Sequence, residues 1–203
     1  LLLHYSPLFF LPFFTLLFFT GIFAEVECRA SIGSATVVVI RGNAKTDAGA
    51  ALKMQDKVAP GTTVITGPRS FVRLLFPDQT QLNVGPDSTM KIEPTKPGEA
   101  SIVDLVGGQL RAKVTKDPHL SQTPNSAVKE KMVVKTKTAA IGIRGTDFNV
   151  SFNPLNNNTA LITFEGMVVM AKVEQGANPF SALRRDSGVQ SVGAGQFSGV
   201  QPD

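Results

Sequence analysis

Two acidic residues beside sharp turns are the first candidates for chemistry in this chain. Glu165 precedes Gly166 between two apolar runs, and Asp147 follows Gly145 and Thr146 in the segment IGIRGTDFNV. Two carboxylates on either side of a sugar can hydrolyse a glycosidic bond, one as acid and the other as base or nucleophile. The tight Glu165–Gly166 turn instead favours a hairpin corner, so we expect a structural role for this carboxylate.

Other catalytic or metal chemistry has few residues to draw on. His119 is the only histidine after the apolar N-terminal stretch, and it lies two residues from Ser121. A nucleophile needs an oriented base, and we expect His119 to be an exposed loop residue instead. The lone Cys28 permits neither an intramolecular disulfide nor a cysteine zinc site. We therefore predict no catalytic residue, no cofactor and no metal.

The tripeptide Arg144-Gly145-Thr146 has a functional and a structural interpretation. A guanidinium offers a planar fork of donors to a carboxylate or to the backbone of a partner. Alternatively, Gly145 permits a bulge, Arg144 pairs with Asp147 or caps carbonyls, and Thr146 begins the next strand. We favour the structural interpretation.

Basic residues are dense in the segment from Arg111 to Arg144, and the formal net charge of the whole chain is +4. Between Arg111 and Arg144 there are eight Lys or Arg residues against Asp117 and Glu130. This segment has no Phe, Tyr or Trp for base stacking, so we predict no nucleic-acid binding. A solvated basic face, open to an anionic polymer, is the expected arrangement of Arg111, Lys113, Lys116, Lys129, Lys131, Lys135 and Lys137.

The N-terminal residues predict the compartment. Leu8 to Ala24 reads LFFLPFFTLLFFTGIFA, an uncharged run that is long for a signal-peptide core and short for a membrane span. Pro12 and Gly21 argue against a permanent membrane helix. We expect residues 1–24 to be a signal peptide cleaved after Ala24, or alternatively after Ala30. The mature protein would then be periplasmic or secreted, or membrane-anchored if the leader is not cleaved.

The sequence predicts β-strands for nearly all of the elements that position these residues. Phe148, Val150 and Phe152 are apolar at every second position, as expected for a strand buried on one face. The corner at Pro77-Asp78 predicts a hairpin, and Gly107-Gly108 is interpreted as a break between two strands. Short helical turns are possible only in GAALKMQDKV and NPFSALRRD. We therefore predict one all-β domain over 33–200, an antiparallel β-sandwich, jelly-roll-like fold or β-roll.

Four blocks of this chain, taken in order, resemble the FecR domain. They are VVVIRGNA, then APGTTVITGPRSFVRLLFPDQTQLNVGPDSTMKI, then VDLVGGQLRAKV, and finally VKTKTAAIGIRGTDFNV followed by ITFEGMVVM. The pattern departs from the family where Gln79 follows Asp78 and where Lys137 follows Thr136. Both departures concern turns.

The resemblance implies a periplasmic β module of the kind that receives a signal from another envelope protein. Our first hypothesis is therefore a non-enzymatic binding module that contacts an envelope protein through edge strands or loops. The second is an envelope-structural or glycan-binding protein that uses the basic face. The third and least favoured is a small hydrolase that uses Asp147 and Glu165.

Overall fold

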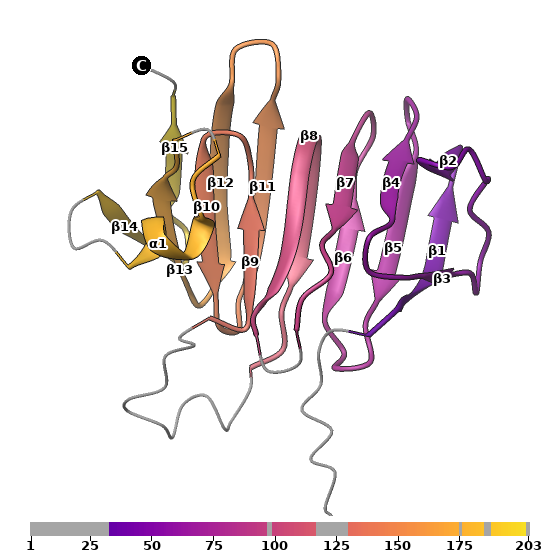
Figure 1. The fold of residues 1–203 in the computed structure, drawn as a ribbon, viewed down its shortest axis with the longest axis horizontal. Helices are drawn as coiled ribbons and strands as arrows, with labels where there is room; N and C mark the ends of the chain where they lie inside the picture. The colour runs from indigo at the N-terminus through magenta and orange to yellow at the C-terminus, as the bar shows by residue number, and fades with distance from the viewer. Residues whose placement is uncertain (1–32, 97–98, 117–129, 175, 185–187, 202–203) are drawn as a thin grey trace, which may run out of the picture.

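The computed structural model describes residues 33–96, 99–116, 130–174, 176–184 and 188–201. Within these ranges the chain is almost entirely β-structure, which confirms the predicted all-β fold class. The predicted signal peptide, Lys129 and the His119 loop lie outside the described residues. Two sheets face each other across one core, as Figure 1 shows from the broad side.

Sheet A consists of eight hydrogen-bonded segments, all antiparallel to their neighbours. Its spatial order is β3 (Lys57–Val58), β1 (Ala35–Arg41), β5 (Phe71–Leu75), β6 (Gln81–Val84), the second half of β8 (Ser101–Lys113), β11 (Asp147–Asn153), β12 (Asn158–Glu165) and β15 (Phe197–Val200).

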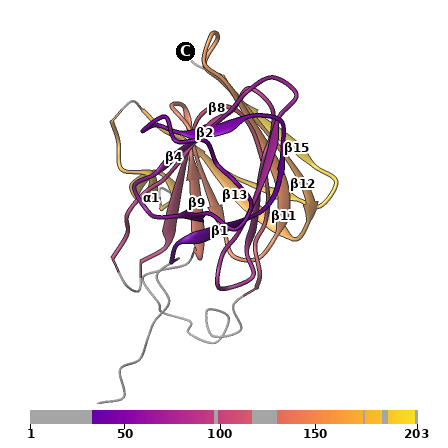
Figure 2. The same ribbon diagram turned by 90° about the vertical axis from the view of Figure 1, so that its right-hand side faces the viewer.

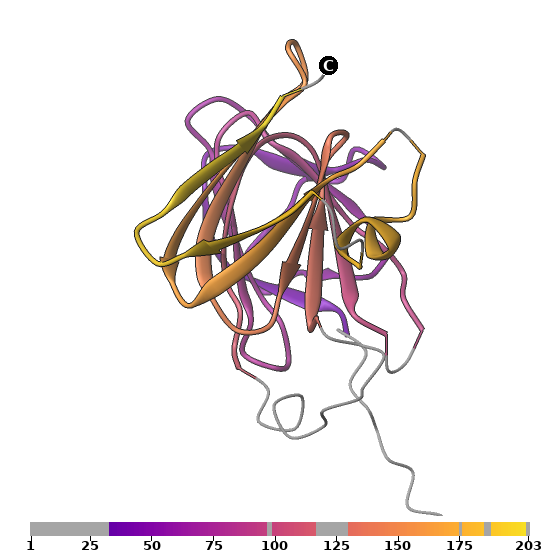
Figure 3. The ribbon, with the colours of Figure 1, turned by 90° about the vertical axis from the view of Figure 1, so that its left-hand side faces the viewer.

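Sheet B has the same number of segments and lies against sheet A. Its order is β2 (Ala44–Thr46), β4 (Thr63–Thr66), β7 (Thr89–Ile92), the first half of β8, β9 (Met132–Lys135), β10 (Ala139–Ile143), β13 (Met167–Lys172) and β14 (Val189–Gly193). Its β8–β9 pair is parallel, whereas its other pairs are antiparallel. Figures 2 and 3 view the two layers from the β1 end and the β15 end.

Strand β8 belongs to both sheets, which corrects the predicted break at Gly107-Gly108. Its first half pairs with β7 and β9, and its second half pairs with β6 and β11. Gly108 has a φ of 91°, and a Cβ there would lie 2.5 Å from the Cα of Ser88. The two glycines therefore bend one continuous strand from sheet B into sheet A, because only a residue without a side chain fits against Ser88.

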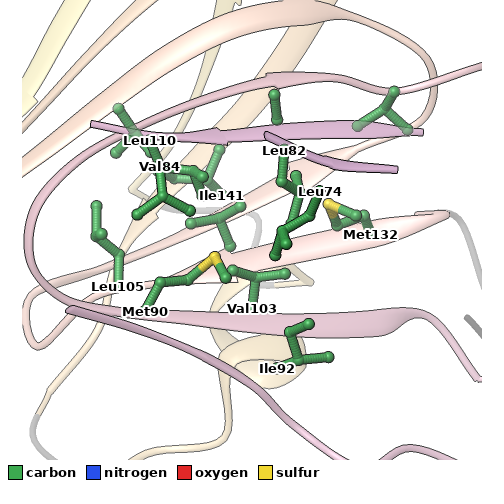
Figure 4. Close-up of a cluster of buried hydrophobic side chains, with 14 of the residues drawn as sticks. Leu74, Leu82, Val84, Met90, Ile92, Val103, Leu105, Leu110, Met132 and Ile141 are labelled. Carbon is green, nitrogen blue, oxygen red and sulfur yellow. The ribbon is translucent and has the colours of Figure 1, made fainter. Parts of the chain in front are cut away.

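The core lies between the inward faces of the two sheets, where alternate residues of each strand are buried. Figure 4 shows side chains from β5, β6 and β8 of sheet A facing side chains from β7, β8 and β9 of sheet B. Residues without any exposed surface include Leu74, Leu82 and Leu110 on one side and Met90 and Leu105 on the other. Period-two alternation in the sequence thus becomes the single apolar interior of a sandwich.

One short helix covers part of the outer face of sheet B. Helix α1 (Pro179–Leu183) forms in the predicted segment NPFSALRRD, and the side chain of Asn178 accepts a hydrogen bond from the backbone N–H of Phe180 at its start. Gly142 of β10 lies directly beneath Leu183, which explains why β10 is buried on both faces. The other candidate segment, 49–58, forms no helix. None of the helices in the described ranges is long and apolar enough to cross a membrane.

Candidate functional site

The motif glycines lie at two corners where the chain crosses from one sheet to the other. Residues 144–146 connect β10 of sheet B to β11 of sheet A, and Gly166 connects β12 of sheet A to β13 of sheet B. A Cβ on Gly166 would lie 2.8 Å from the Cγ2 of Thr146 and 3.1 Å from the carbonyl oxygen of Gly145. The two corners therefore pack on each other. The predicted hairpin at Glu165–Gly166 is wrong, because β12 and β13 pair with different neighbours.

The Gly145-Thr146 part of the motif is held inside this end of the sandwich. A Cβ on Gly145 would lie 2.8 Å from the Cα of Lys116, so the chain leaving β8 passes directly over the glycine. Thr146 is buried, and its carbonyl accepts a hydrogen bond of 2.9 Å from the backbone N–H of Val114. The Thr146 hydroxyl has no hydrogen-bond partner among the described residues. Gly145 and Thr146 are therefore both buried.

Asp147 pairs with Arg111, and not with Arg144 as the sequence suggested. The Nε and Nη2 atoms of Arg111 each donate to one carboxylate oxygen of Asp147 at 2.9 Å. The hydrogen bonds that Arg111 donates to Asp147, together with the negative charge of Asp147, raise the pKa of the guanidinium above its ordinary value, and burial opposes this shift only in part. The register places the two residues close together, because Asp147 lies opposite Lys113 on β8, two positions from Arg111. Arg144 is exposed.

A polar groove runs across the outer face of sheet A, and we call it the sheet A groove. Its volume is about 480 Å³. Arg73, Asn83 and Arg111 form a row across its floor, since the register aligns Arg73 with Asn83 and Asn83 with Arg111. Its lining residues are Phe71, Arg73, Gln81, Asn83, Gly85, Pro86, Gln109, Arg111, Lys113, Asp147 and Asn149.

The predicted basic residues do not gather on one face within the described part of the chain. Arg111 and Lys113 line the sheet A groove, whereas Lys135 lies on sheet B, where its Nζ contacts Asp104 at 3.1 Å and Glu93 at 3.3 Å. Lys131 contacts Asp78 at 2.6 Å. Lys116 and Lys137 are exposed on connections between strands. Of the six predicted basic residues that the structure describes, Arg111 and Lys113 remain as candidates for a binding surface, and Arg73 joins them.

The β15 end of sheet A carries an exposed apolar patch. Ile162 of β12 lies opposite Phe197 of β15, and both point outward with 37% and 70% of their surface exposed. Phe164 is also exposed, and the guanidinium carbon of Arg111 lies 4.5 Å from the centre of its ring. The patch therefore borders the groove through the Arg111–Phe164 contact.

The hydrolase hypothesis needs two carboxylates that are free to act on a sugar, and one of the two acids at these corners is already paired. Asp147 and Glu165 are cross-strand neighbours, as the hydrolase hypothesis requires. Both oxygens of Asp147, however, accept hydrogen bonds from Arg111, so a sugar could contact them only by displacing the guanidinium. Across the described ranges, no three His, Cys, Asp or Glu residues are grouped so that they could hold a metal ion.

Sequence reasoning missed the residues that make the groove from β5 and β6. Arg73 and Asn83 occupy outward positions of short alternating strands, where polar residues are expected in any sandwich. Their polar side chains gave no signal of function, because only the strand order brings them beside Arg111. The exposed Ile162 and Phe164, which break the alternation of β12, were the available sequence signal for the patch.

The fold is that of an all-β module with a polar groove on one face and, at one end, a strand that is paired on one side only among the described strands. A model of the family described as "FecR protein" matches residues 62–169, which is more than half of the 203 residues. The chain belongs to the FecR family. The matched region includes the groove strands β5, β6, β8 and β11 and both packed corners, whereas β15 lies beyond it.

Comparison with solved structures gives distant similarities. Two crystal structures of a candidate anti-sigma factor from Parabacteroides distasonis ATCC 8503 each align with a TM-score of 0.48 and 14% sequence identity. The alignments cover 70% of this chain and 60% of the other chain, so less than two thirds of that protein is represented here. No curated protein shows significant similarity to the chain.

Proposed function

We propose that this FecR-family chain is an exported, non-enzymatic module of the bacterial cell envelope that binds a partner protein and relays a signal. Family membership supports the regulatory role. The observation that carries the binding mode is the unpaired edge of β15, which we call the β15 edge. Among the described strands β15 pairs only with β12, so one side of it has backbone groups without strand partners.

The register identifies the backbone groups at this edge. The Thr163 N–H donates to the carbonyl of Gln196 at 3.2 Å. Hydrogen-bonded and non-hydrogen-bonded pairs alternate along an antiparallel ladder, so Ser198 turns its backbone groups toward β12. Phe197 and Gly199 consequently direct their N–H and C=O groups away from β12. An added strand would hydrogen-bond to these two residues.

Side chains beside the edge favour a protein strand that carries apolar residues. The outward pair Ile162 and Phe197, with Phe164 next to it, gives the outer face an exposed apolar area directly beside the free backbone groups. Exposed apolar patches on soluble proteins commonly mark interaction sites. A partner strand that continued sheet A would place every second side chain over this patch.

Site-specific photocrosslinking in cells tests the proposal. A photoreactive aromatic amino acid would replace Phe197 in the full chain, and the matched control would replace Met54, which is exposed at the other end of the sandwich. We expect one dominant envelope protein to be crosslinked from position 197 and not from position 54. Gly199→Pro should abolish that crosslink, because it removes an edge N–H without removing a bond to β12. Equal products from both positions, or none from position 197, would contradict the proposal.

The envelope location is part of the proposal and has its own test. The apolar run from Leu8 to Ala24 supports export. Mass spectrometry of the N-terminal peptide from fractionated cells distinguishes cleavage after Ala24, cleavage after Ala30 and an intact leader. Recovery of the protein only in the cytoplasmic fraction would contradict the proposed location.

A further inference from the structure

We propose that the sheet A groove is a binding site for an acidic glycan chain. This site is separate from the β15 edge and does not depend on the proposed partner protein. Three observations carry the proposal: two guanidinium groups held in fixed positions, a series of amide side chains that extends beyond one hollow, and an excess of positive charge.

The two guanidinium groups are positioned by their neighbours before any ligand binds. The Nε of Arg73 donates to the Oδ1 of Asn83 at 2.7 Å, and the Nδ2 of Asn83 donates to the carbonyl of Arg111 at 3.3 Å. Asp147 holds Arg111 from the other side through two hydrogen bonds, and Phe164 lies under its guanidinium. Arg73 therefore keeps both terminal amino groups, and Arg111 keeps Nη1, as donors for a ligand.

Amide side chains give the groove the donors and acceptors that sugar hydroxyls require. Gln81, Asn83, Gln109 and Asn149 line it, and each amide can both donate and accept a hydrogen bond. The side chain of Gln109 lies across Gly85, where an added Cβ would be 2.8 Å from its Nε2. Gly85 has no side chain, so the amide of Gln109 can lie directly against the backbone at this position.

The groove extends beyond the length of one sugar. A second hollow of about 440 Å³ adjoins it and shares Pro86 and Gln109 with it. This second hollow continues along β11 toward the β11–β12 turn, where its lining includes Asn153, Asn156 and Asn158. Each hollow has the volume of a small-ligand site, roughly 300–1,000 Å³. Two adjoining amide-rich hollows favour a chain of sugars over a single one.

Charge selects an acidic glycan over a neutral one. Arg73, Arg111 and Lys113 face one carboxylate in the first hollow, Asp147, and Asp87 lines the second hollow. Three positive charges against two negative charges leave the two hollows together with an excess of one. A nucleic acid has a charge at every nucleotide and needs aromatic residues for stacking, whereas Phe71 is the only aromatic residue that lines the first hollow. A peptide strand would use the β15 edge, because the backbone groups in the centre of sheet A are already paired.

Isothermal titration calorimetry of the purified protein tests this inference. The probes are hexamers of galacturonate, hyaluronan and polysialic acid, with neutral maltohexaose, hexaglutamate and a single-stranded oligothymidylate as comparisons. We expect at least one acidic glycan to bind at least tenfold more tightly than maltohexaose and hexaglutamate. If hexaglutamate bound as tightly as the acidic glycans, charge alone would explain the binding, and the proposal would be overturned. Preference for oligothymidylate, or no binding of any acidic glycan, would also overturn it.

Matched variants locate the site. Arg73→Gln and Arg111→Gln remove a charge and keep a polar side chain, so each should weaken binding of the acidic glycan at least tenfold. Lys137→Gln makes the same charge change outside the groove and should leave binding unchanged. Circular dichroism and thermal midpoints would establish that the variants are folded. Equal weakening by all three variants would contradict the assignment to the groove. Phe197→Ser, at the β15 edge, should not affect glycan binding, which separates this site from the proposed partner site.

Discussion

Arg111 of β8 and Asp147 of β11 are joined across sheet A by two hydrogen bonds of 2.9 Å each. The pair connects two features of the molecule, because Asp147 follows the packed corner at Gly145-Thr146 and Arg111 lies on the floor of the sheet A groove. The acidic residue of the motif thus fixes the position of a binding donor. The conformation of the corner is thereby linked to the surface of the groove.

The Arg111–Asp147 pair should contribute little to stability. It is partly exposed, with 51% of the Arg111 side chain accessible, and exposed ion pairs typically contribute about 0.2–1 kcal/mol. A double-mutant cycle of Arg111→Ala and Asp147→Ala, measured by urea unfolding, should give a coupling free energy in this range. The coupling should also decrease at high salt. A coupling above about 2 kcal/mol would show that the pair stabilises the fold and does more than orient the groove.

The bend in β8 requires Gly108. Gly108→Ala should lower the free energy of unfolding by roughly 3 kcal/mol or more, because the Cβ would both strain a φ of 91° and collide with the backbone of Ser88. Gly195→Ala is the matched control: its φ is 77°, but a Cβ there meets no atom within 4 Å. It should cost only about 1–2 kcal/mol. Similar losses of unfolding free energy in the two variants would contradict a close approach between Gly108 and the backbone of Ser88.

Two buried threonines should respond in opposite ways to replacement by valine. The Thr146 hydroxyl is buried without a partner among the described residues, so Thr146→Val should leave stability unchanged or raise it by about 1 kcal/mol. The Thr159 hydroxyl contacts the hydroxyls of Thr136 at 2.7 Å and Thr138 at 2.9 Å, so Thr159→Val should cost about 1–3 kcal/mol. Chemical denaturation measures both. A large loss of unfolding free energy in Thr146→Val would mean that this hydroxyl has a hydrogen-bond partner, and it would contradict the prediction.

Asp78 should make the protein sensitive to acid. Burial raises the pKa of Asp78, but hydrogen bonds from Lys131 and Thr80 and the charge of Lys131 together hold this pKa below its ordinary value of 3.8. The stabilisation is therefore present above pH 3.8 and is lost as the pH falls through the lower pKa of the folded state. Asp78→Asn should flatten the decline in unfolding free energy below pH 3.8. Asp47→Asn, at an exposed residue, should not. Identical acid profiles for the two variants would contradict this assignment.

Local patterns were sufficient to predict the fold class and several turns. Alternation in β11 predicts one buried face, and the Pro77-Asp78 corner does form a hairpin, in which Asp78 accepts a hydrogen bond from the backbone N–H of Thr80. These features depend on residues within a few positions of one another. The resemblance to the FecR domain, carried by four short blocks, was confirmed by the family match.

Relations between distant strands could not be predicted in the same way. Gly107-Gly108 and Glu165–Gly166 were read as ordinary turns, yet one bends a continuous strand and the other crosses between sheets. A glycine signals that the backbone needs freedom, and it does not indicate which strand follows. The basic residues from Arg111 to Lys137 were expected on one face because they are close in sequence. Strand direction and sheet assignment separate them.

Hydrogen exchange at the β15 edge, measured by NMR on the protein alone and with its crosslinked partner, tests the central claim most directly. The account predicts fast exchange of the Phe197 and Gly199 amides in the free protein and slow exchange in the complex. The Ser198 amide should be protected in both, because it bonds to β12. Unchanged exchange at Phe197 and Gly199 in a saturated complex would contradict binding by strand addition at this edge.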